Sequence, residues 1–293
     1  MITCNLMGGL GNQLFQIFAT ISYALNAVVE YNFLNTTTLG GNGNTLRYTF
    51  WNNMFRKLQP VLINKNPNEM VLMREPHFKY TELRVAGLNN SQHVCIHGYF
   101  QSYKYFDSNY YTIYNLLNID ELNREVLKKL EKNPNRYSFT KNDLSSSISM
   151  HFRLGDYKKL TNFHPVMSCD YYIKSLKYIL EKDTPKTVLY FCEEEDIQTV
   201  EETVEKCKYQ FPSVEFIRVS NDFADWEQLL LMSDCKHHII ANSSFSWWGA
   251  YIGFKTNHRN KIICYPSLWF THNENTDDLF PSKWIRINCS NKN

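Results

Sequence analysis

The second half of the chain alternates apolar runs with segments whose apolar residues recur at helical spacing. The runs predict strands and the periodic segments predict helices. The predicted strands are 147–153, 187–192, 214–219, 237–241 and 261–265, and the predicted helices are 170–182, 197–206, 222–233 and 244–253. Asp170 is a candidate N-cap of the first of these helices. Such alternation predicts a parallel sheet with helices on both faces.

The first half opens in the same way but then becomes harder to interpret. A buried strand over 2–7, a glycine turn at Gly8–Gly11, a helix over 13–28 and a β-prone run over 29–34 are predicted. Residues 35–44 read as a loop, and 45–93 give no clear pattern. A further strand is predicted over 94–100 and a helix over 110–132, which the sequence NPN at 133–135 ends.

The fold class that follows is α/β with two domains. The boundary is expected between 135 and 147, which gives an N-terminal domain over 1–140 and a C-terminal domain over 141–293. The last residues end in a strand-like segment, FPSKWIRIN, and we leave open whether they pack back on the N-terminal domain.

Composition narrows the class of protein. The 293 residues are 43% hydrophobic and 20% charged, as in a folded globular protein, and the net charge is only +2. Without a basic run, nucleic acid is not an expected partner. With no signal peptide and no apolar run of about 20 residues, we expect a cytoplasmic protein (in the infected host cell, if the source is viral), which leaves peripheral membrane contact open. The eight cysteines form no metal-ligand or CxxC pattern and read as reduced, mostly buried thiols.

Three segments place small or hydrogen-bonding residues where a strand passes into a loop or helix. They are MGGLGNQLFQ at 7–16, HFRLGDY at 151–157 and ANSSFSWWGA at 241–250. In alternating α/β proteins this edge of the sheet binds nucleotide ligands. The three segments therefore predict a site for a phosphate-bearing ligand.

HFRLGDY offers the strongest chemistry of the three. Arg153 carries a planar fork of donors suited to a diphosphate, His151 can donate or accept a hydrogen bond, and Gly155 permits a tight turn. Asp156 can orient the arginine, accept a proton or cap a turn. The alternative is a surface turn with a structural Arg–Asp pair.

GGLGNQ would let the backbone approach a ligand at a helix N-terminus, with Asn12 and Gln13 adding polar groups. It matches neither GxGxxG nor a P-loop, so an ordinary strand–helix turn is the alternative. In ANSSFSWWGA, Ser243, Ser244 and Ser246 can cap the helix and bind phosphate oxygens. The two tryptophans that follow are better explained as core than as a sugar platform.

A carboxylate upstream of the last motif has a separate candidate role. Asp225, in DFADWEQ, could read the N1–H and N2 amine of guanine, or it could simply cap a helix. No metal site is predicted, because the acidic run Glu193–Asp196 has no DxD pattern and reads as a solvated turn.

The motifs GGLGNQLFQ, GYFQSYKYF, HFRLGDY and NSSFSWWGA occur in this order, and the chain resembles the α-1,2-fucosyltransferases of glycosyltransferase family 11. The resemblance spans about residues 1–270. It implies a GT-B-type fold of two Rossmann-like domains whose parallel sheets face a cleft. It also implies GDP-L-fucose as donor, inversion at the anomeric carbon, and no metal ion or cofactor.

By this resemblance Arg153 would bind the donor β-phosphate and stabilise the leaving GDP. His151 and Gly155 would shape that pocket, and Asp225 would face guanine. The remaining donor-binding residues would be Gly9, Gly11, Asn12, Asn242, Ser243, Ser244 and Phe245. Leu154 stands where many members have a second arginine, so a double-arginine clamp is not expected.

The expected function is transfer of L-fucose to a sugar hydroxyl of an oligosaccharide or glycoconjugate acceptor. The expected acceptor atom is O2 of a β-galactoside, with Asp156 as candidate general base. One alternative is a transferase that uses another GDP-sugar or forms another linkage. Another is a glycan-binding protein that keeps the fold without catalysis. Acceptor contacts are expected from residues 35–110.

Overall fold

The structure is a computed structural model that describes residues 1–40, 45–84, 92–158, 163–256, 260–272 and 274–289. The side chain of Asp156 lies outside this description. Contacts divide the chain into an N-terminal unit, Met1–Leu122 with Asn275–Pro281, and a C-terminal unit, Asn123–Glu274 with Ser282–Asn293. This division falls upstream of the 135–147 boundary that the sequence suggests.

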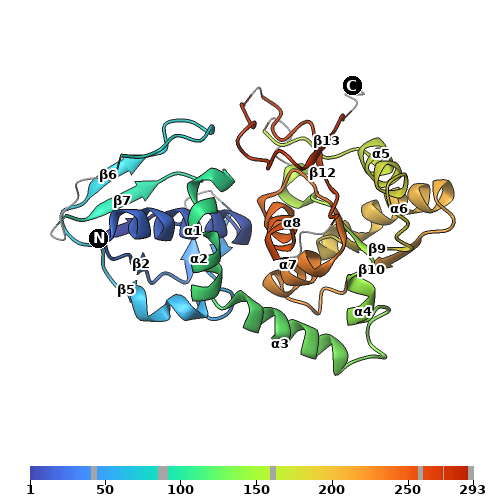
Figure 1. Cartoon of the computed structure of the whole chain (residues 1–293), viewed down its shortest axis with the longest axis horizontal. Helices are drawn as coiled ribbons and strands as arrows, with labels where there is room; N and C mark the ends of the chain where they lie inside the picture. The colour runs from blue at the N-terminus through green and yellow to red at the C-terminus, as the bar shows by residue number, and fades with distance from the viewer. Residues whose placement is uncertain (41–44, 85–91, 159–162, 257–259, 273, 290–293) are drawn as a thin grey trace. The chain divides into compact units, whose positions relative to one another are not determined.

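The N-terminal unit is built from short parallel strands around one long helix (Figure 1). Its strands are β1 (Ile2–Cys4), β2 (Phe33–Leu34), β3 (Thr38–Leu39), β4 (Arg47–Tyr48), β5 (Leu62–Ile63), β6 (Val71–Arg74) and β7 (Val94–His97). Its helices are α1 (Leu10–Ala27), η1 (Arg56–Val61), η2 (Tyr103–Tyr105), η3 (Asp107–Asn109) and α2 (Tyr110–Leu116). A parallel sheet has the order β1-β7-β6, β2 pairs in parallel with β5, and β3 pairs with β4 in antiparallel.

Apolar residues explain why α1 forms the centre of this unit. Its sequence is LGNQLFQIFATISYALNA, and every position from Leu10 to Ala24 except Asn12 is buried. Phe18 packs against Phe106 and Tyr110, with ring centroids 5.3 and 5.8 Å apart. The helix begins at Leu10, so Gly11 lies inside its first turn and not in the preceding loop as the sequence suggested.

The C-terminal unit holds a fully parallel sheet of order β10-β9-β8-β11-β12-β13. The strands are β8 (Ile148–His151), β9 (Thr187–Phe191), β10 (Glu215–Arg218), β11 (His237–Ile239), β12 (Ile263–Pro266) and β13 (Ile285–Ile287). The helices are α4 (Lys141–Leu144), η4 (Gly155–Lys158), α5 (Cys169–Leu180), η5 (Glu194–Asp196), α6 (Ile197–Gln210), α7 (Asp225–Asp234) and α8 (Ser244–Thr256). The helices α5 and α6 contact each other, as do α7 and α8 (Figure 1).

The α/β class and the parallel sheet of the second half are confirmed, and every strand predicted there is present. The placement of the two sheets facing a cleft stays a prediction. All eight cysteines are free thiols, and six of them are buried, which confirms that most of them are small core residues. Among the described residues, no helix combines the length and apolar character that crossing a bilayer requires.

Two predictions at helix ends are wrong. The helix expected over 110–132 is two helices, α2 and α3 (Ile119–Glu131), because Asn118 adopts φ 53° between them. Asparagine tolerates this left-handed conformation better than other non-glycine residues. The N-cap of α5 is Ser168 and not Asp170, which lies in the first turn and pairs with Lys174 at 2.6 Å.

Because α7 packs closely against α8, we expect Gly→Ala substitutions at two glycines of α8 to destabilise the protein by different amounts. A Cβ at Gly253 would lie 2.4 Å from the backbone oxygen of Ser233, which cannot move aside, whereas a Cβ at Gly249 would meet mainly the Met232 side chain. Gly253→Ala should therefore lower the free energy of unfolding by about 1–3 kcal/mol more than Gly249→Ala, since alanine improves helix propensity equally at both. Urea unfolding of the two variants measures the difference, and equal midpoints would contradict it.

Candidate functional site

The C-terminal unit has a topological switch point between its central strands β8 and β11. From β8 the chain moves outward through β9 to β10, and it then returns to β11 and continues in the opposite direction to β12 and β13. In open parallel sheets, ligands bind outside the carboxyl ends of the strands at such a point. HFRLGDY begins at the last residue of β8, and ANSSF follows β11. Because β8 and β11 are parallel neighbours, their carboxyl ends and these two motifs lie side by side.

The loop after β8 is held by a buried carboxylate from the loop after β9. Asp196 is 1% exposed, and its Oδ2 accepts a hydrogen bond from the Gly155 backbone N–H at 2.6 Å. Its Oδ1 accepts one from Lys158 Nζ at 2.7 Å. A buried carboxylate is stable only when its oxygens are satisfied, so this pair of contacts fixes the shape of the loop.

Arg153 projects from the same loop and pairs with Glu193, which also follows β9. Its guanidinium lies 5.2 Å from the ring centroid of Tyr157, and its side chain is 18% exposed. Gly155 has φ +28°, and a Cβ there would lie 2.4 Å from Glu193 Oε2. The glycine expected at this turn is therefore favoured by its backbone conformation, whereas Glu193 could move aside from a Cβ because its carboxylate is the end of a flexible, half-exposed side chain.

His151, at the end of β8, is neutral in the folded protein. Burial, with a smaller contribution from the Arg153 charge, lowers its pKa to about 3. Its ring lies against that of Phe245 at a tilt of 42°, with centroids 5.4 Å apart, and its Nδ1 has no hydrogen-bond partner among the described residues. A neutral imidazole with a free nitrogen can bind a ligand through one hydrogen bond.

The loop after β11 is organised mainly by Asn242, which is 1% exposed. Its Nδ2 donates to the backbone oxygens of Pro165 and Trp269 at 2.9 and 3.2 Å, and its backbone oxygen accepts from the Tyr157 hydroxyl at 3.1 Å. The side-chain donors of Asn242 are thus engaged within the protein. What this residue offers a ligand is Oδ1, which has no partner among the described residues.

Ser243 and Ser244 lead from this loop into α8, whose first residue is Ser244. Ser243 is buried, whereas Ser244 and Phe245 are partly exposed. The first amide groups of a helix lack partners inside the helix and attract anions. The next residues, Trp247 and Trp248, are completely buried, which confirms that they are core residues.

Asp225 is the first residue of α7 and is exposed, and α7 packs against α8. Its neighbour Asp222 is instead engaged, since its carboxylate bonds Arg136 Nε at 2.9 Å. Glu227 is engaged too, with its carboxylate accepting from the Ala224 backbone N–H. Asp225 is therefore the carboxylate of this segment that remains accessible to a ligand.

The interpretation of Glu193–Asp196 as a solvated turn is wrong for Asp196, which is buried, whereas the other three residues are exposed. Glu193 and Asp196 hold the Arg153 loop, and they were missed because they are far from it in sequence. Among the described residues, Glu193, Glu195 and Asp196 bring carboxylate oxygens within 4.8 Å of one another, as a metal site would. Two of the three carboxylates already form ion pairs, Glu193 with Arg153 and Asp196 with Lys158. The cluster therefore neutralises the positive charges of the loop after β8.

The glycine loop of the N-terminal unit is fixed by two glutamines from α1. The Gln16 side chain exchanges two hydrogen bonds with the Met7 backbone, at 2.8 and 3.2 Å. Gln13 Nε2 donates to the backbone oxygens of Gly8 and Tyr48, at 3.0 and 2.8 Å. Both glutamines are fully buried, and polar residues on an apolar helix face are the signal that could have revealed this role.

The three predicted residues of this loop lie in different surroundings. Gly9 is the N-cap of α1, and a Cβ there would meet open space, so nothing within the unit requires a glycine. Gly11 is buried in the first helical turn. Asn12 Oδ1 accepts from Gln101 Nε2 at 2.9 Å. Gly8, which was not among the predicted residues, has φ +74° and needs to be glycine.

Comparison with known proteins shows similarity over nearly the whole chain. The family model described as Glycosyl transferase family 11 matches residues 1–288. The O-antigen biosynthesis glycosyltransferase WbnK of Escherichia coli is 28% identical over 98% of this chain and 100% of its own length. An α-1,2-colitosyltransferase of Escherichia coli is 35% identical over 49% of this chain and 48% of its own length.

A more distant relative is a galactoside 2-α-L-fucosyltransferase of Caenorhabditis elegans, which is 24% identical over 99% of this chain and 80% of its own length. Among solved structures, a glycosyl transferase family 9 protein from Veillonella parvula is similar with a TM-score of 0.48 and 11% identity, over 98% of this chain and 86% of that chain.

The lowered pKa of His151 predicts a specific dependence of stability on pH. Between about pH 6 and pH 4 the unfolded chain gains a proton at His151 that the folded chain does not, so stability falls as the pH falls. His151→Gln removes this proton uptake. The slope of unfolding free energy against pH should then decrease by roughly 1 kcal/mol per pH unit in that window.

Denaturant unfolding at several pH values measures this slope. His272→Gln, at an exposed position of the same unit, is the control and should keep the wild-type slope. A slope unchanged in His151→Gln would mean that His151 is not held neutral.

Proposed function

Because the chain belongs to glycosyltransferase family 11, we propose that it transfers L-fucose from GDP-L-fucose to O2 of a β-galactoside. Family membership makes the protein a glycosyltransferase, with a nucleotide-sugar donor and a glycan acceptor. The relative named a galactoside 2-α-L-fucosyltransferase supports the choice of sugar and linkage. The observation that carries the proposal is Arg153, held by Glu193 beside the switch point of the parallel sheet.

In this proposal the donor diphosphate lies at the carboxyl ends of β8 and β11. Arg153 presents a fork of N–H donors to the phosphates, and the first amides of α8 add partial positive charge. Negative charge on GDP increases as the bond from the sugar C1 to the phosphate oxygen breaks. Groups already oriented by Glu193 and by the loop stabilise this charge without reorganising, which lowers the barrier.

The acceptor hydroxyl attacks C1 from the face opposite to the departing GDP, which inverts the anomeric configuration. Alignment of the two reactants supplies a large part of the rate enhancement. Asp156 remains our candidate for the general base that receives the hydroxyl proton. His151, being neutral, would hydrogen-bond the ligand and would not carry charge. Since Arg153 and α8 supply the positive charge, the reaction should not need a metal ion or a cofactor.

A second candidate donor is a nucleotide-activated colitose. It is favoured by the relative with 35% identity, whose name assigns it α-1,2-colitosyl transfer. The linkage proposed here agrees with both named activities. A non-catalytic glycan-binding protein is the other alternative, and the position of Arg153 disfavours it because a lectin has no use for a diphosphate site.

The deciding experiment measures GDP release from a panel of GDP-sugars, with and without β-galactosides, in the presence of EDTA. We expect release from GDP-fucose that β-galactosides accelerate and chelation leaves unchanged. Faster release from a colitose donor would favour the second candidate. Glycan binding without any binding of GDP would favour the non-catalytic alternative, and restoration of activity by Mn²⁺ would refute the metal-free mechanism.

Arg153→Ala should reduce transfer by roughly 10²–10³, because it removes a charge-assisted contact that strengthens as GDP departs. Arg153→Lys should recover little of this activity, since an ammonium group cannot reproduce the planar fork. Steady-state kinetics of both variants measure the loss. Arg136→Ala, which removes a more exposed Arg–Asp pair of the same unit, is the matched control and should keep wild-type activity. Near-normal turnover of Arg153→Ala would show that the donor diphosphate does not bind at Arg153.

Asp225→Ala should weaken binding of GDP by roughly 1–3 kcal/mol while leaving pyrophosphate binding unchanged, because its proposed partner is the guanine edge. The variant should also distinguish poorly between GDP and inosine diphosphate, which lacks the N2 amine. Calorimetric titration of both nucleotides tests this prediction, with Asp222→Ala as control. If the ratio of the dissociation constants for GDP and inosine diphosphate is unchanged in Asp225→Ala, Asp225 only stabilises helix α7 and does not bind guanine.

A further inference from the structure

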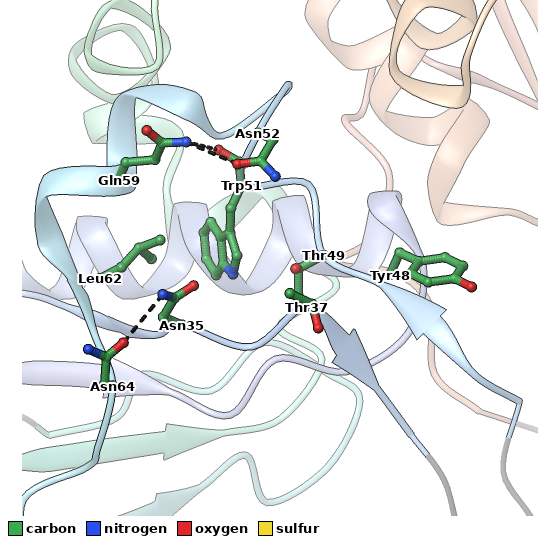
Figure 2. Close-up of a pocket in the computed structure, with 9 residues that line it drawn as sticks. All are labelled: Asn35, Thr37, Tyr48, Thr49, Trp51, Asn52, Gln59, Leu62 and Asn64. Carbon is green, nitrogen blue, oxygen red and sulfur yellow. Dashed lines mark hydrogen bonds between the residues drawn. The ribbon is translucent and has the colours of Figure 1, made fainter.

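The N-terminal unit contains a pocket with a volume of about 540 Å³ that none of the three motifs forms (Figure 2). Its size lies within the range of roughly 300–1,000 Å³ that is common for small-molecule sites. The lining residues come from the segment that runs from the end of β2 to the residue after β5: Asn35, Thr37, Tyr48, Thr49, Trp51, Asn52, Gln59, Leu62 and Asn64. We refer to it as the amide pocket.

Uncharged polar groups dominate the amide pocket. It has four side-chain amides, from three asparagines and a glutamine, together with two threonines and a tyrosine, and none of its nine residues is acidic or basic. Small-molecule pockets are usually lined mainly by apolar groups. A ligand that displaces water here must replace many hydrogen bonds, and an apolar ligand cannot do so.

The architecture fixes the floor of the pocket and leaves its polar groups available. Trp51 is 4% exposed, packs on Phe33 and Phe55, and donates its indole N–H to the backbone oxygen of Thr36 at 3.0 Å. Thr49 donates its hydroxyl to the same oxygen at 2.6 Å. These contacts hold the base of the pocket in place.

The amides at the rim have only partial hydrogen bonding within the protein. Asn35 and Asn64 share one long contact of 3.4 Å, and Gln59 Nε2 donates to Asn52 Oδ1 at 3.1 Å (Figure 2). Gln59 Nε2 also donates to the Trp51 backbone oxygen at 3.2 Å, but all four amide residues are exposed, and each keeps a donor or acceptor group for which the described residues supply no hydrogen bond. An amide presents a donor and an acceptor side by side, which matches adjacent hydroxyls of a sugar ring.

Tyr48 joins the amide pocket to the glycine loop. Its backbone oxygen accepts from Gln13 Nε2, which also bonds the Gly8 oxygen, and its ring is 67% exposed. Asn35 and Asn64 follow the parallel strands β2 and β5, at the edge that also carries the loop after β1. The pocket therefore lies beside the glycine loop within this unit, with an exposed ring on which the C–H face of a sugar can pack.

We propose that the amide pocket binds the acceptor, and that the acceptor is a neutral oligosaccharide, without sialic or uronic acid. Calling the bound saccharide the acceptor rests on the proposed function, whereas the prediction that the pocket binds a saccharide does not depend on it. The lining offers amide and hydroxyl donors but no cationic side chain, so a carboxylate on the ligand would lose part of its hydration without gaining a charged partner. The pocket therefore selects against charged glycans.

The test uses a printed array of neutral and acidic oligosaccharides, so that binding is measured without turnover. Wild type should bind neutral glycans in preference to their sialylated counterparts. Asn64→Ala and Tyr48→Ala should each weaken this binding about fivefold to tenfold, the loss expected from one hydrogen bond or one ring contact. Asn68→Ala and Tyr209→Ala, at exposed positions outside the pocket, are the matched controls and should bind as wild type does.

GDP titration and GDP release without acceptor, measured on the same variants, separate this inference from the proposed function. Both should be unchanged in Asn64→Ala and Tyr48→Ala, while the acceptor KM rises by the same factor as the loss on the array. Pocket variants that bind glycans normally would overturn the amide pocket and leave the proposed function standing. A wild type that binds no neutral glycan, or prefers sialylated ones, would also overturn it. Failure to cleave any GDP-sugar, with pocket-dependent glycan binding intact, would refute the proposed function alone.

Discussion

The buried carboxylate of Asp196 is the contact on which the candidate site depends. It follows β9, yet it bonds the Gly155 amide and the Lys158 ammonium group, both of which follow β8. A carboxylate at 1% exposure is tolerated only because both oxygens are paired. Removing either partner would leave a buried charge uncompensated. The conformation of the loop after β8 therefore depends on the turn after the neighbouring strand β9 as well as on the loop's own residues.

This constraint explains how Arg153 can remain oriented when no ligand is bound. Glu193 lies on the same turn as Asp196. It pairs with the guanidinium of Arg153, and its carboxylate occupies the space that a Cβ at Gly155 would enter. A guanidinium has five N–H donors, so it can bond a carboxylate on one edge and an anion on another. Glu193 is 43% exposed, whereas the Arg153 side chain that it pairs with is 18% exposed. The turn after β9 thus orients the cation and partly neutralises its charge.

The sequence predicted the second half well because its elements are long and strictly alternate. Strand β9 is an almost continuous apolar run, β8 alternates the apolar Ile148 and Met150 with polar residues, and helices such as α5 have apolar residues at helical spacing. The first half contains strands of only two residues, such as β2 and β5, which are too short to produce a periodic pattern. The amide pocket is formed by these short elements, so the sequence predicted none of its residues, and the expectation of acceptor contacts from residues 35–110 stays a prediction.

The candidate site was predicted in part for a related physical reason. Gly155 was identified because a turn after a strand has a local signature, and the structure gives it φ +28°. Glu193 and Asp196 were missed because their partners lie about 40 residues away in sequence, across a neighbouring strand. A run of acidic residues looks identical in sequence whether it faces solvent or a cation. Position at the carboxyl end of the strand adjacent to β8 is the feature that distinguishes the two cases.

The two units differ in the chemistry they offer a ligand, and this difference has a consequence for specificity. The C-terminal unit presents Arg153 and a helix N-terminus, which bind anions strongly but discriminate little among sugars. The amide pocket offers neutral groups, each of which gains little because it exchanges one hydrogen bond with water for another. A ligand lacking one matching hydroxyl, however, leaves a polar group unpaired, and such mismatches are costly. If both proposals hold, affinity for the charged donor and selectivity for the neutral acceptor reside in different units of the chain.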